Sequence, residues 1–313
     1  MNANLQSIQQ TPYSIPVTTQ LGHVHLTVAN LDRQIAFYQK VLGMQLHWRA
    51  GKSAGLGAGE QDILRLTEVK GAQRPRGTTG LYHFALMYPN RKELARATAR
   101  LFSLRYPNSP TDHTVSESIY LDDPEGQTIE LYILTLQRGT IEVKDGNLIL
   151  HRTDGKPATG RDPLDLDNLF RELSPDDRLD LPLPVETTLG HVNLYEASLA
   201  DTAYFYHDLL GFERGPVSPN YQMGEVGLSP ERPHVVAFNT WQGEGARPAS
   251  PNSQGIRYFT VELPDPAELG QVLERVRQAG IATEETAEGI LVRDPGSIGV
   301  VLTFANKGTG AQN

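Results

Sequence analysis

Residues 21–46 read LGHVHLTVANLDRQIAFYQKVLGMQL, and this stretch decides the fold. Polar and apolar residues alternate along 23–28, as in a half-buried β-strand. This places His23, His25 and Thr27 on one face and Val24, Leu26 and Val28 on the other. Residues 30–43 then place apolar side chains at helical spacing and end on Gly43, a residue typical of the end of a helix. The stretch therefore predicts a strand followed by an amphipathic helix.

The same pattern returns 168 positions further along the chain, where residues 189–214 read LGHVNLYEASLADTAYFYHDLLGFER. A weaker match relates GLYHFALMYPNRKELARA, from Gly80, to GIRYFTVELPDPAELGQV, from Gly255. Each half also ends on a similar hairpin with an Asp-Pro turn, YLDDPEGQTIELYI in the first and LVRDPGSIGVVLTF in the second. The chain is therefore predicted to be a duplicated domain, and the period is too long for a solenoid.

Inside each half, the order strand, helix, several strands occurs twice, which predicts an α+β fold with two βαβββ modules per half. The expected divisions are an N-terminal extension (1–20), a first domain (21–136), a linker with a short helix (137–188), a second domain (189–305) and a tail (306–313). The linker is assigned from its content of Pro, Asp and Gly.

The overall composition is that of a soluble globular protein, with 39% hydrophobic and 21% charged residues in 313. A net charge of −9 argues against nucleic acid or an anionic membrane as partner. The N-terminus lacks the features of a signal peptide, and no apolar run suggests a membrane span, so a cytoplasmic location is expected. Because the chain has no cysteine, any metal must be held by nitrogen and oxygen atoms.

Glu130 lies within TIELYI (128–133), which otherwise reads as a strand, and a carboxylate facing inward needs a partner. His23 is on the polar face of one expected strand, and His83 is near the start of another. Two imidazoles and one carboxylate from three strands can converge on one cation and leave coordination positions open. This ligand set suits Fe(II), or Mn(II) in its place.

The repeated modules resemble the vicinal oxygen chelate superfamily, which includes glyoxalase I, bleomycin-resistance proteins and extradiol dioxygenases. Residues 111–130, TDHTVSESIYLDDPEGQTIE, resemble the extradiol dioxygenase signature along their length, and residues 21–135 are similar to the catalytic half of catechol-2,3-dioxygenase-like proteins. The resemblance implies an open, barrel-like curved sheet in each half. It implies that His23, His83 and Glu130 bind iron and that His113 and Tyr120 stand near the substrate oxygens. It also implies a small aromatic diol and O2 as substrates.

The chain departs from that family in three respects. The stretch before His83, LTEVKGAQRPRGTTGLYH, offers no further histidine, so the residue that assists O2 activation is unassigned. His113 and Tyr120 are seven residues apart, so His113 must lie in a loop for both to face one site. In the second half, Tyr258 and Val301 stand where His83 and Glu130 do in the first, so that half is expected to bind no metal. His191 and His234 could form part of a second polar pocket, but we interpret them as remnants of duplication.

Several residues have simpler interpretations. We interpret His25, His47, His151 and His207 as satisfied polar residues, and Trp48 and Trp241 as packing residues. The leading functional hypothesis is an Fe(II)-dependent extradiol dioxygenase that acts on a catechol-type diol. The alternatives are a glyoxalase-like isomerase, for which only Glu68 offers a fourth ligand, and a metal-free binding protein of the bleomycin-resistance type. The substrate, and whether the chain forms a homo-oligomer, stay open.

Overall fold

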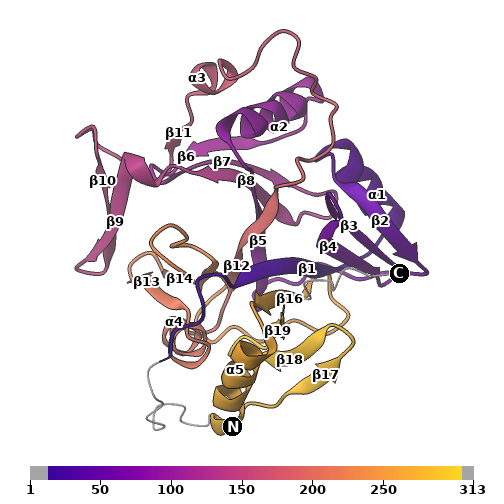
Figure 1. The fold of residues 1–313 in the computed structure, drawn as a ribbon, viewed down its shortest axis with the longest axis vertical. Coiled ribbons are helices and arrows are strands. Elements are labelled where there is room, and N and C mark those ends of the chain that lie inside the picture. The colour runs from indigo at the N-terminus through magenta and orange to yellow at the C-terminus, as the bar shows by residue number, and fades with distance from the viewer. Residues whose placement is uncertain (1–12, 305–313) are drawn as a thin grey trace, which may run out of the picture.

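The computed structural model describes residues 13–304 (Figure 1). Residues 1–12 of the expected N-terminal extension and the expected tail, 306–313, lie outside the described residues. As expected, the chain contains four strand-helix-strand modules. The first half contributes module 1, made of β1 (Gln20–Val28), α1 (Leu31–Lys40), β2 (Gln45–Ala50), β3 (Ser53–Ala58) and β4 (Gln61–Glu68). It also contributes module 2, made of β5 (Gly80–Met87), α2 (Arg91–Ser103), β6 (Ser109–Asp112), β7 (Ser116–Asp122) and β8 (Thr128–Leu134).

The second half repeats this order. Module 3 consists of β12 (Thr188–Tyr195), α4 (Leu199–Ala203), the one-turn helix η3 (Tyr204–Leu209), β13 (Glu213–Ser218), β14 (Met223–Gly227) and β15 (Val236–Asn239). Module 4 consists of β16 (Gly255–Leu263), α5 (Pro266–Gln278), β17 (Glu284–Thr286), β18 (Gly289–Arg293) and β19 (Gly299–Phe304). The fold is therefore the predicted duplicated α+β arrangement, with two large sheets that are not closed.

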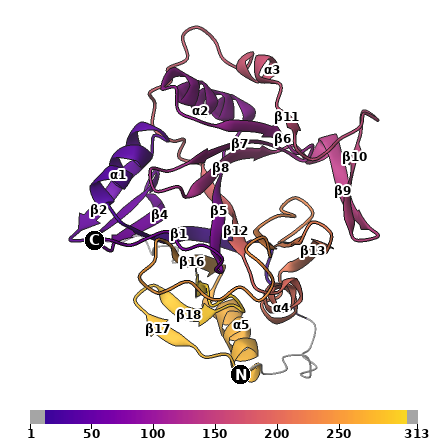
Figure 2. The same ribbon diagram turned by 180° about the vertical axis from the view of Figure 1, so that it is seen from behind.

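Each large sheet combines one module from each half. The nine-stranded sheet has the order β11-β6-β7-β8-β5-β12-β15-β14-β13, so module 2 pairs with module 3 through antiparallel β5 and β12. The eight-stranded sheet has the order β17-β18-β19-β16-β1-β4-β3-β2, so module 4 pairs with module 1 through β16 and β1. Figure 2 shows β1, β16, β5 and β12 together at the centre of the molecule. The expectation of one curved sheet per half is therefore corrected, because the two halves exchange modules.

The core lies between the sheets and their helices, and the predicted apolar faces are buried. Val24, Leu26 and Val28 of β1 are all buried. Helix α1 begins at the N-cap Asn30, whose side chain accepts a hydrogen bond from the Arg33 backbone N–H. Gly43 follows the helix with a φ of 73°, a left-handed conformation that favours glycine.

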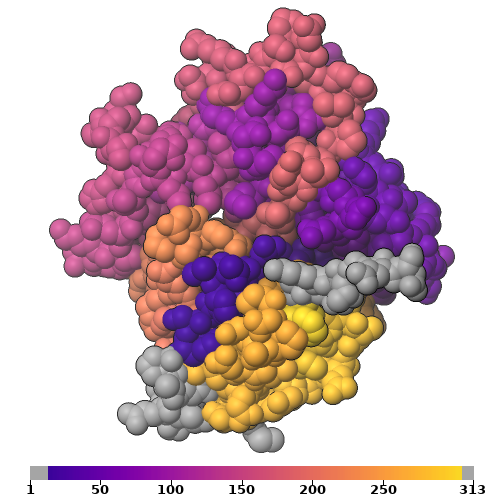
Figure 3. All heavy atoms as spheres, viewed as in Figure 1, coloured from indigo at the N-terminus to yellow at the C-terminus, as the bar shows by residue number. Residues whose placement is uncertain are grey.

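The linker contains more structure than the expected short helix, α3 (Leu166–Phe170). After the short helix η2 (Leu136–Arg138), β9 (Gly139–Lys144) and β10 (Asn147–Arg152) form a separate hairpin, and β11 (Asp162–Pro163) adds to the edge of the nine-stranded sheet beside β6. The hairpin lies against the β13–β14 segment (Figure 3), where the Ser218 hydroxyl donates to the Gly146 carbonyl over 2.6 Å. The linker thus connects the two outer ends of the nine-stranded sheet.

Candidate metal centre

Three potential metal ligands meet on adjacent strands of the nine-stranded sheet. His83 is on β5, Glu130 on β8 and His191 on β12, and β5 lies between the other two strands. Ala85 of β5 is the register partner of both Glu130 and His191. Its small side chain leaves space over the middle strand, so that the three longer side chains converge there.

The three ligand atoms form an equilateral triangle. Each of the distances between His83 Nε2, His191 Nε2 and Glu130 Oε2 is 3.1 Å. Two ligand atoms at a right angle around a cation, each bound at about 2.2 Å, are about 3.1 Å apart. The triangle therefore fits one face of an octahedral metal site, and all three residues are at least 96% buried.

Protons alone satisfy this triangle poorly, because a proton placed between two of its atoms leaves the third without a partner. Burial by itself raises the pKa of Glu130, but His191 and His83 outweigh burial and hold that pKa well below its ordinary value. The Ser118 hydroxyl donates to the other carboxylate oxygen, Glu130 Oε1, over 2.6 Å. Oε2 is thereby left facing the two imidazoles, and a divalent cation would compensate this buried carboxylate. The donor set of two imidazoles and one carboxylate fits Fe(II).

His23 is not part of this triangle, which corrects the expected ligand set. It lies on β1 in the other large sheet, where its Nε2 is 3.0 Å from Glu288 Oε2. Tyr258 and Arg65 contact the same Glu288 carboxylate over 2.7 Å each. The reason is the exchange of modules, since the neighbour of β5 is β12 and not β1.

His191 takes the place that was expected for His23. The two histidines occupy equivalent positions in the duplicated sequence, 168 residues apart. The candidate ligand thus has the expected residue type and the expected position within its module, but it comes from the second half. That half was expected to bind no metal, and in the fold its module 3 lies beside His83 and Glu130.

His113 and Tyr120 lie beside the triangle and contact each other. His113 is in the β6–β7 turn, as their spacing required, and its Nε2 is 2.9 Å from the Tyr120 hydroxyl. The Nδ1 atom of His113 donates to the Gly160 carbonyl over 2.5 Å, so in the neutral ring Nε2 accepts the proton of Tyr120. The Tyr120 ring centroid is 5.7 Å from that of His83. Burial and Glu130 raise the pKa of Tyr120 well above its ordinary value.

His234 is a further residue of the site that was interpreted as a remnant. It precedes β15, and its ring centroid lies 4.2 Å from that of His191. Its Nδ1 is paired with the Glu225 carboxylate of β14. Burial lowers the pKa of His234, but Glu225 outweighs burial and raises it. The stretch before His83 holds no further histidine, whereas module 3 lies beside His83 in the fold and brings His234 near it.

The other residues interpreted as satisfied polar groups have partners away from the triangle. His25, His47, His151 and His207 contact Thr67, Asp62, Glu142 and the Phe212 carbonyl, respectively. Glu68, considered as a fourth ligand, instead accepts a hydrogen bond from the Leu31 backbone N–H.

A separate cleft of about 990 Å³ is lined by residues that include Arg74, Gln127 and Tyr195, and none of the triangle residues lines it. Between residues 13 and 304, no helix is long and apolar enough to cross a membrane.

Comparison with known proteins shows the family of this chain. Residues 20–131 and 188–296 match the family model described as glyoxalase/bleomycin resistance protein/dioxygenase superfamily. A catechol-2,3-dioxygenase of Bacillus subtilis (strain 168) is 36% identical over 296 residues, which cover 93% of this chain and 99% of that protein.

Two solved structures share the fold at low identity. A putative dioxygenase from Bacillus subtilis subsp. subtilis str. 168 has a TM-score of 0.65 at 14% identity, covering 95% of this chain and 87% of that one. Glyoxalase I from Zea mays has a TM-score of 0.55 at 18% identity, covering 92% of each chain. The family model and the 36% identical relative show that the chain belongs to the glyoxalase/bleomycin resistance protein/dioxygenase superfamily.

Proposed function

We propose that this protein is an Fe(II)-dependent extradiol dioxygenase, which opens the ring of a catechol-type diol with O2. The observation that carries the proposal is the triangle of His83 Nε2, Glu130 Oε2 and His191 Nε2, with sides of 3.1 Å. The catechol-2,3-dioxygenase that is 36% identical to this chain supports the same reaction type. On this proposal the protein acts in the breakdown of aromatic compounds.

Fe(II) held by these three residues would leave about three of six octahedral positions for the two oxygens of a diol and for O2. The residues around it would then orient the substrate and move protons. A catechol must lose protons when both of its oxygens bind a metal. When the His113 ring is neutral, Nε2 keeps a lone pair because Nδ1 donates to Gly160, and the ring can accept such a proton through the Tyr120 hydroxyl.

On the opposite side, His234 and Glu225 offer a second proton carrier. The raised pKa of His234 favours its protonated ring. Its ring centroid is 4.2 Å from that of His191, so it can hold a proton close to the site. One side of the site is thus suited to accept a proton and the other to donate one. Ring cleavage by O2 needs both steps.

The reaction can be tested on protein loaded with Fe(II) without oxygen and then mixed with catechol and air. The expected result is a yellow ring-opened semialdehyde that carries both atoms of labelled O2. Turnover that proceeds equally well without O2 would contradict the proposal and favour an isomerase. Protein loaded with Zn(II), which has no redox chemistry, is the control and is expected to form no product.

A further inference from the structure

The linker brings its residues 159–163 directly to the site. The Gly160 carbonyl accepts the hydrogen bond from His113 Nδ1, and the next residues form β11 along β6. The Asp162 carboxylate fixes the local turn by accepting from the Thr159 backbone N–H and hydroxyl, over 3.0 and 2.8 Å. Arg161 is therefore held between two residues whose positions are set by hydrogen bonds.

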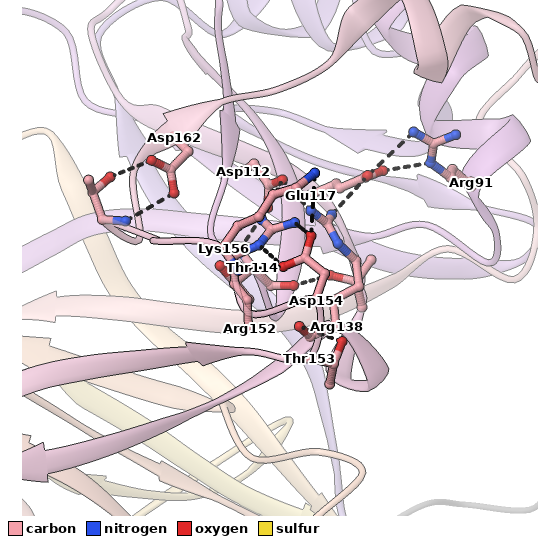
Figure 4. A network of polar contacts seen from close by, with 12 residues as sticks. Arg91, Asp112, Thr114, Glu117, Arg138, Arg152, Thr153, Asp154, Lys156 and Asp162 are labelled. Carbon is pink, nitrogen blue, oxygen red and sulfur yellow. Dashed lines mark hydrogen bonds and ion pairs between the residues drawn. The ribbon is translucent and has the colours of Figure 1, made fainter.

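A network of ion pairs lies where the first residues of the linker leave module 2 (Figure 4). Arg138 pairs with Asp112 and also with Glu117, over 3.1 Å in the second case. Arg91 binds the same Glu117 carboxylate over 2.8 Å, and Arg152 binds Asp154 over 2.9 Å. Each of these three arginines therefore has a carboxylate partner.

Arg161 differs from them. No salt bridge joins its guanidinium to a carboxylate within residues 13–304, and its side chain is exposed. Its guanidinium carbon lies 5.9 Å from the centre of the Trp241 ring. Trp241 in turn contacts Tyr82 at 5.3 Å between ring centroids, and Tyr82 contacts His83 at 4.8 Å. The guanidinium of Arg161 thus lies at the end of a row of aromatic contacts, through Trp241 and Tyr82, that reaches His83.

We propose that Arg161 binds a carboxylate on the substrate, so that the substrate class is a catechol with an acidic ring substituent. This inference rests on the proposed function and specifies its substrate. The planar guanidinium can donate two parallel hydrogen bonds to a carboxylate, and the rings of Trp241 and Tyr82 offer apolar surface to an aromatic ring. Arg161 is then a specificity-determining residue, while the diol oxygens bind at the metal.

The first test compares kcat/KM for 3,4-dihydroxybenzoate and for catechol in the Fe(II)-loaded protein and in the variant Arg161→Gln. The ratio of the two kcat/KM values is expected to fall by about 10-fold or more, because a charge-assisted hydrogen bond is lost only with the acid. Arg161→Lys is expected to keep part of the preference for the acid. The matched control is Arg178→Gln, since Arg178 is exposed and its ionic partner is the exposed Asp180. A ratio that Arg161→Gln leaves unchanged would overturn the inference.

The second test measures binding without turnover. Trp48 and Trp241 are the two tryptophans of the chain, so Trp48→Phe leaves Trp241 as the sole tryptophan reporter of fluorescence. Anaerobic titration with 3,4-dihydroxybenzoate is expected to quench Trp241 at lower concentration than catechol does, and Arg161→Gln is expected to abolish that difference. If this difference is found while no diol is cleaved, the inference stands and the dioxygenase proposal fails. If diols are cleaved while both ligands bind equally well with and without Arg161, the dioxygenase proposal stands and the inference fails.

Discussion

Tyr120 and His113 form a chain of hydrogen bonds with a defined direction. The Gly160 carbonyl can only accept, which places the proton of a neutral His113 ring on Nδ1 and leaves Nε2 to accept from Tyr120. Neither residue belongs to the triangle of potential metal ligands. Their expected effect is therefore on the rate of proton transfer and not on the retention of metal.

We predict that Tyr120→Phe and His113→Ala keep the metal content of the unchanged protein but turn over catechol more slowly, by roughly 10²-fold or more. The measurements are elemental analysis and initial rates on the same samples. His151→Ala is a suitable control, because His151 forms an exposed pair with Glu142 on the linker hairpin. Full activity in both site variants would reduce Tyr120 and His113 to packing residues.

Glu130, Tyr120 and His113 were expected in one site because residues 111–130 resemble the extradiol dioxygenase signature. The structure brings the three together because a hairpin fixes their relative positions. His191, His234 and Arg161 reach the site from other segments. Their positions depend on which strands pair and on where the linker runs, and no local spacing encodes either feature.

Periodicity alone predicted most elements of the modules, since the apolar residues of β1, β5, β8, α1 and α2 recur at strand or helix spacing and are buried. The hairpin of β9 and β10 was missed, although residues 141–150, IEVKDGNLIL, alternate around an Asp-Gly pair. Asp145 and Gly146 have φ values of 50° and 78°, as a tight two-residue hairpin turn requires. The signal was present, but the high content of Pro, Asp and Gly nearby favoured an interpretation as a simple linker.

A buried pair of carboxyl groups connects the end of β12 to the β18–β19 turn. Burial and the neighbouring Asp294 raise the pKa of Glu196 well above its ordinary value, and burial also raises the pKa of Asp294. The Asp294 carboxylate accepts hydrogen bonds from the Tyr206 hydroxyl and from the Ile298 backbone N–H, each over 2.8 Å. Within the described residues, neither carboxyl oxygen of Glu196 has a hydrogen bond of good geometry. The Glu196 side chain is thus favoured in its neutral form.

This pair predicts that stability falls as pH rises. A carboxyl group whose pKa is raised in the folded state binds a proton that the unfolded chain releases, so its contribution is fully present below the unfolded pKa of about 4.3 and is lost as pH increases through the folded pKa. We expect Glu196→Gln to unfold at a higher temperature than the unchanged protein at pH 8 and to show a flatter pH dependence. Thermal unfolding between pH 5 and pH 9 measures this, with the exposed Glu60→Gln as control. A steeper pH dependence in Glu196→Gln would contradict the account.

At the scale of the whole molecule, the two halves are joined by exchange of modules. β5 of the first half pairs with β12 of the second, and β16 of the second half pairs with β1 of the first. A duplicated sequence cannot decide this pairing by itself, because equivalent strands present similar edges and similar apolar faces. The consequence for function is that the proposed metal centre needs strands from both halves.

The most direct test of this account is the metal content of two equivalent histidine variants. His191→Ala and His23→Ala remove the same residue type from equivalent positions of the repeat, after anaerobic loading with Fe(II) and removal of unbound metal. We predict that the unchanged protein and His23→Ala retain about one metal per chain, while His191→Ala and Glu130→Ala lose it, because each removes one of three ligands of the triangle. Loss of metal in His23→Ala together with full retention in His191→Ala would contradict the assignment of the site to the paired modules 2 and 3.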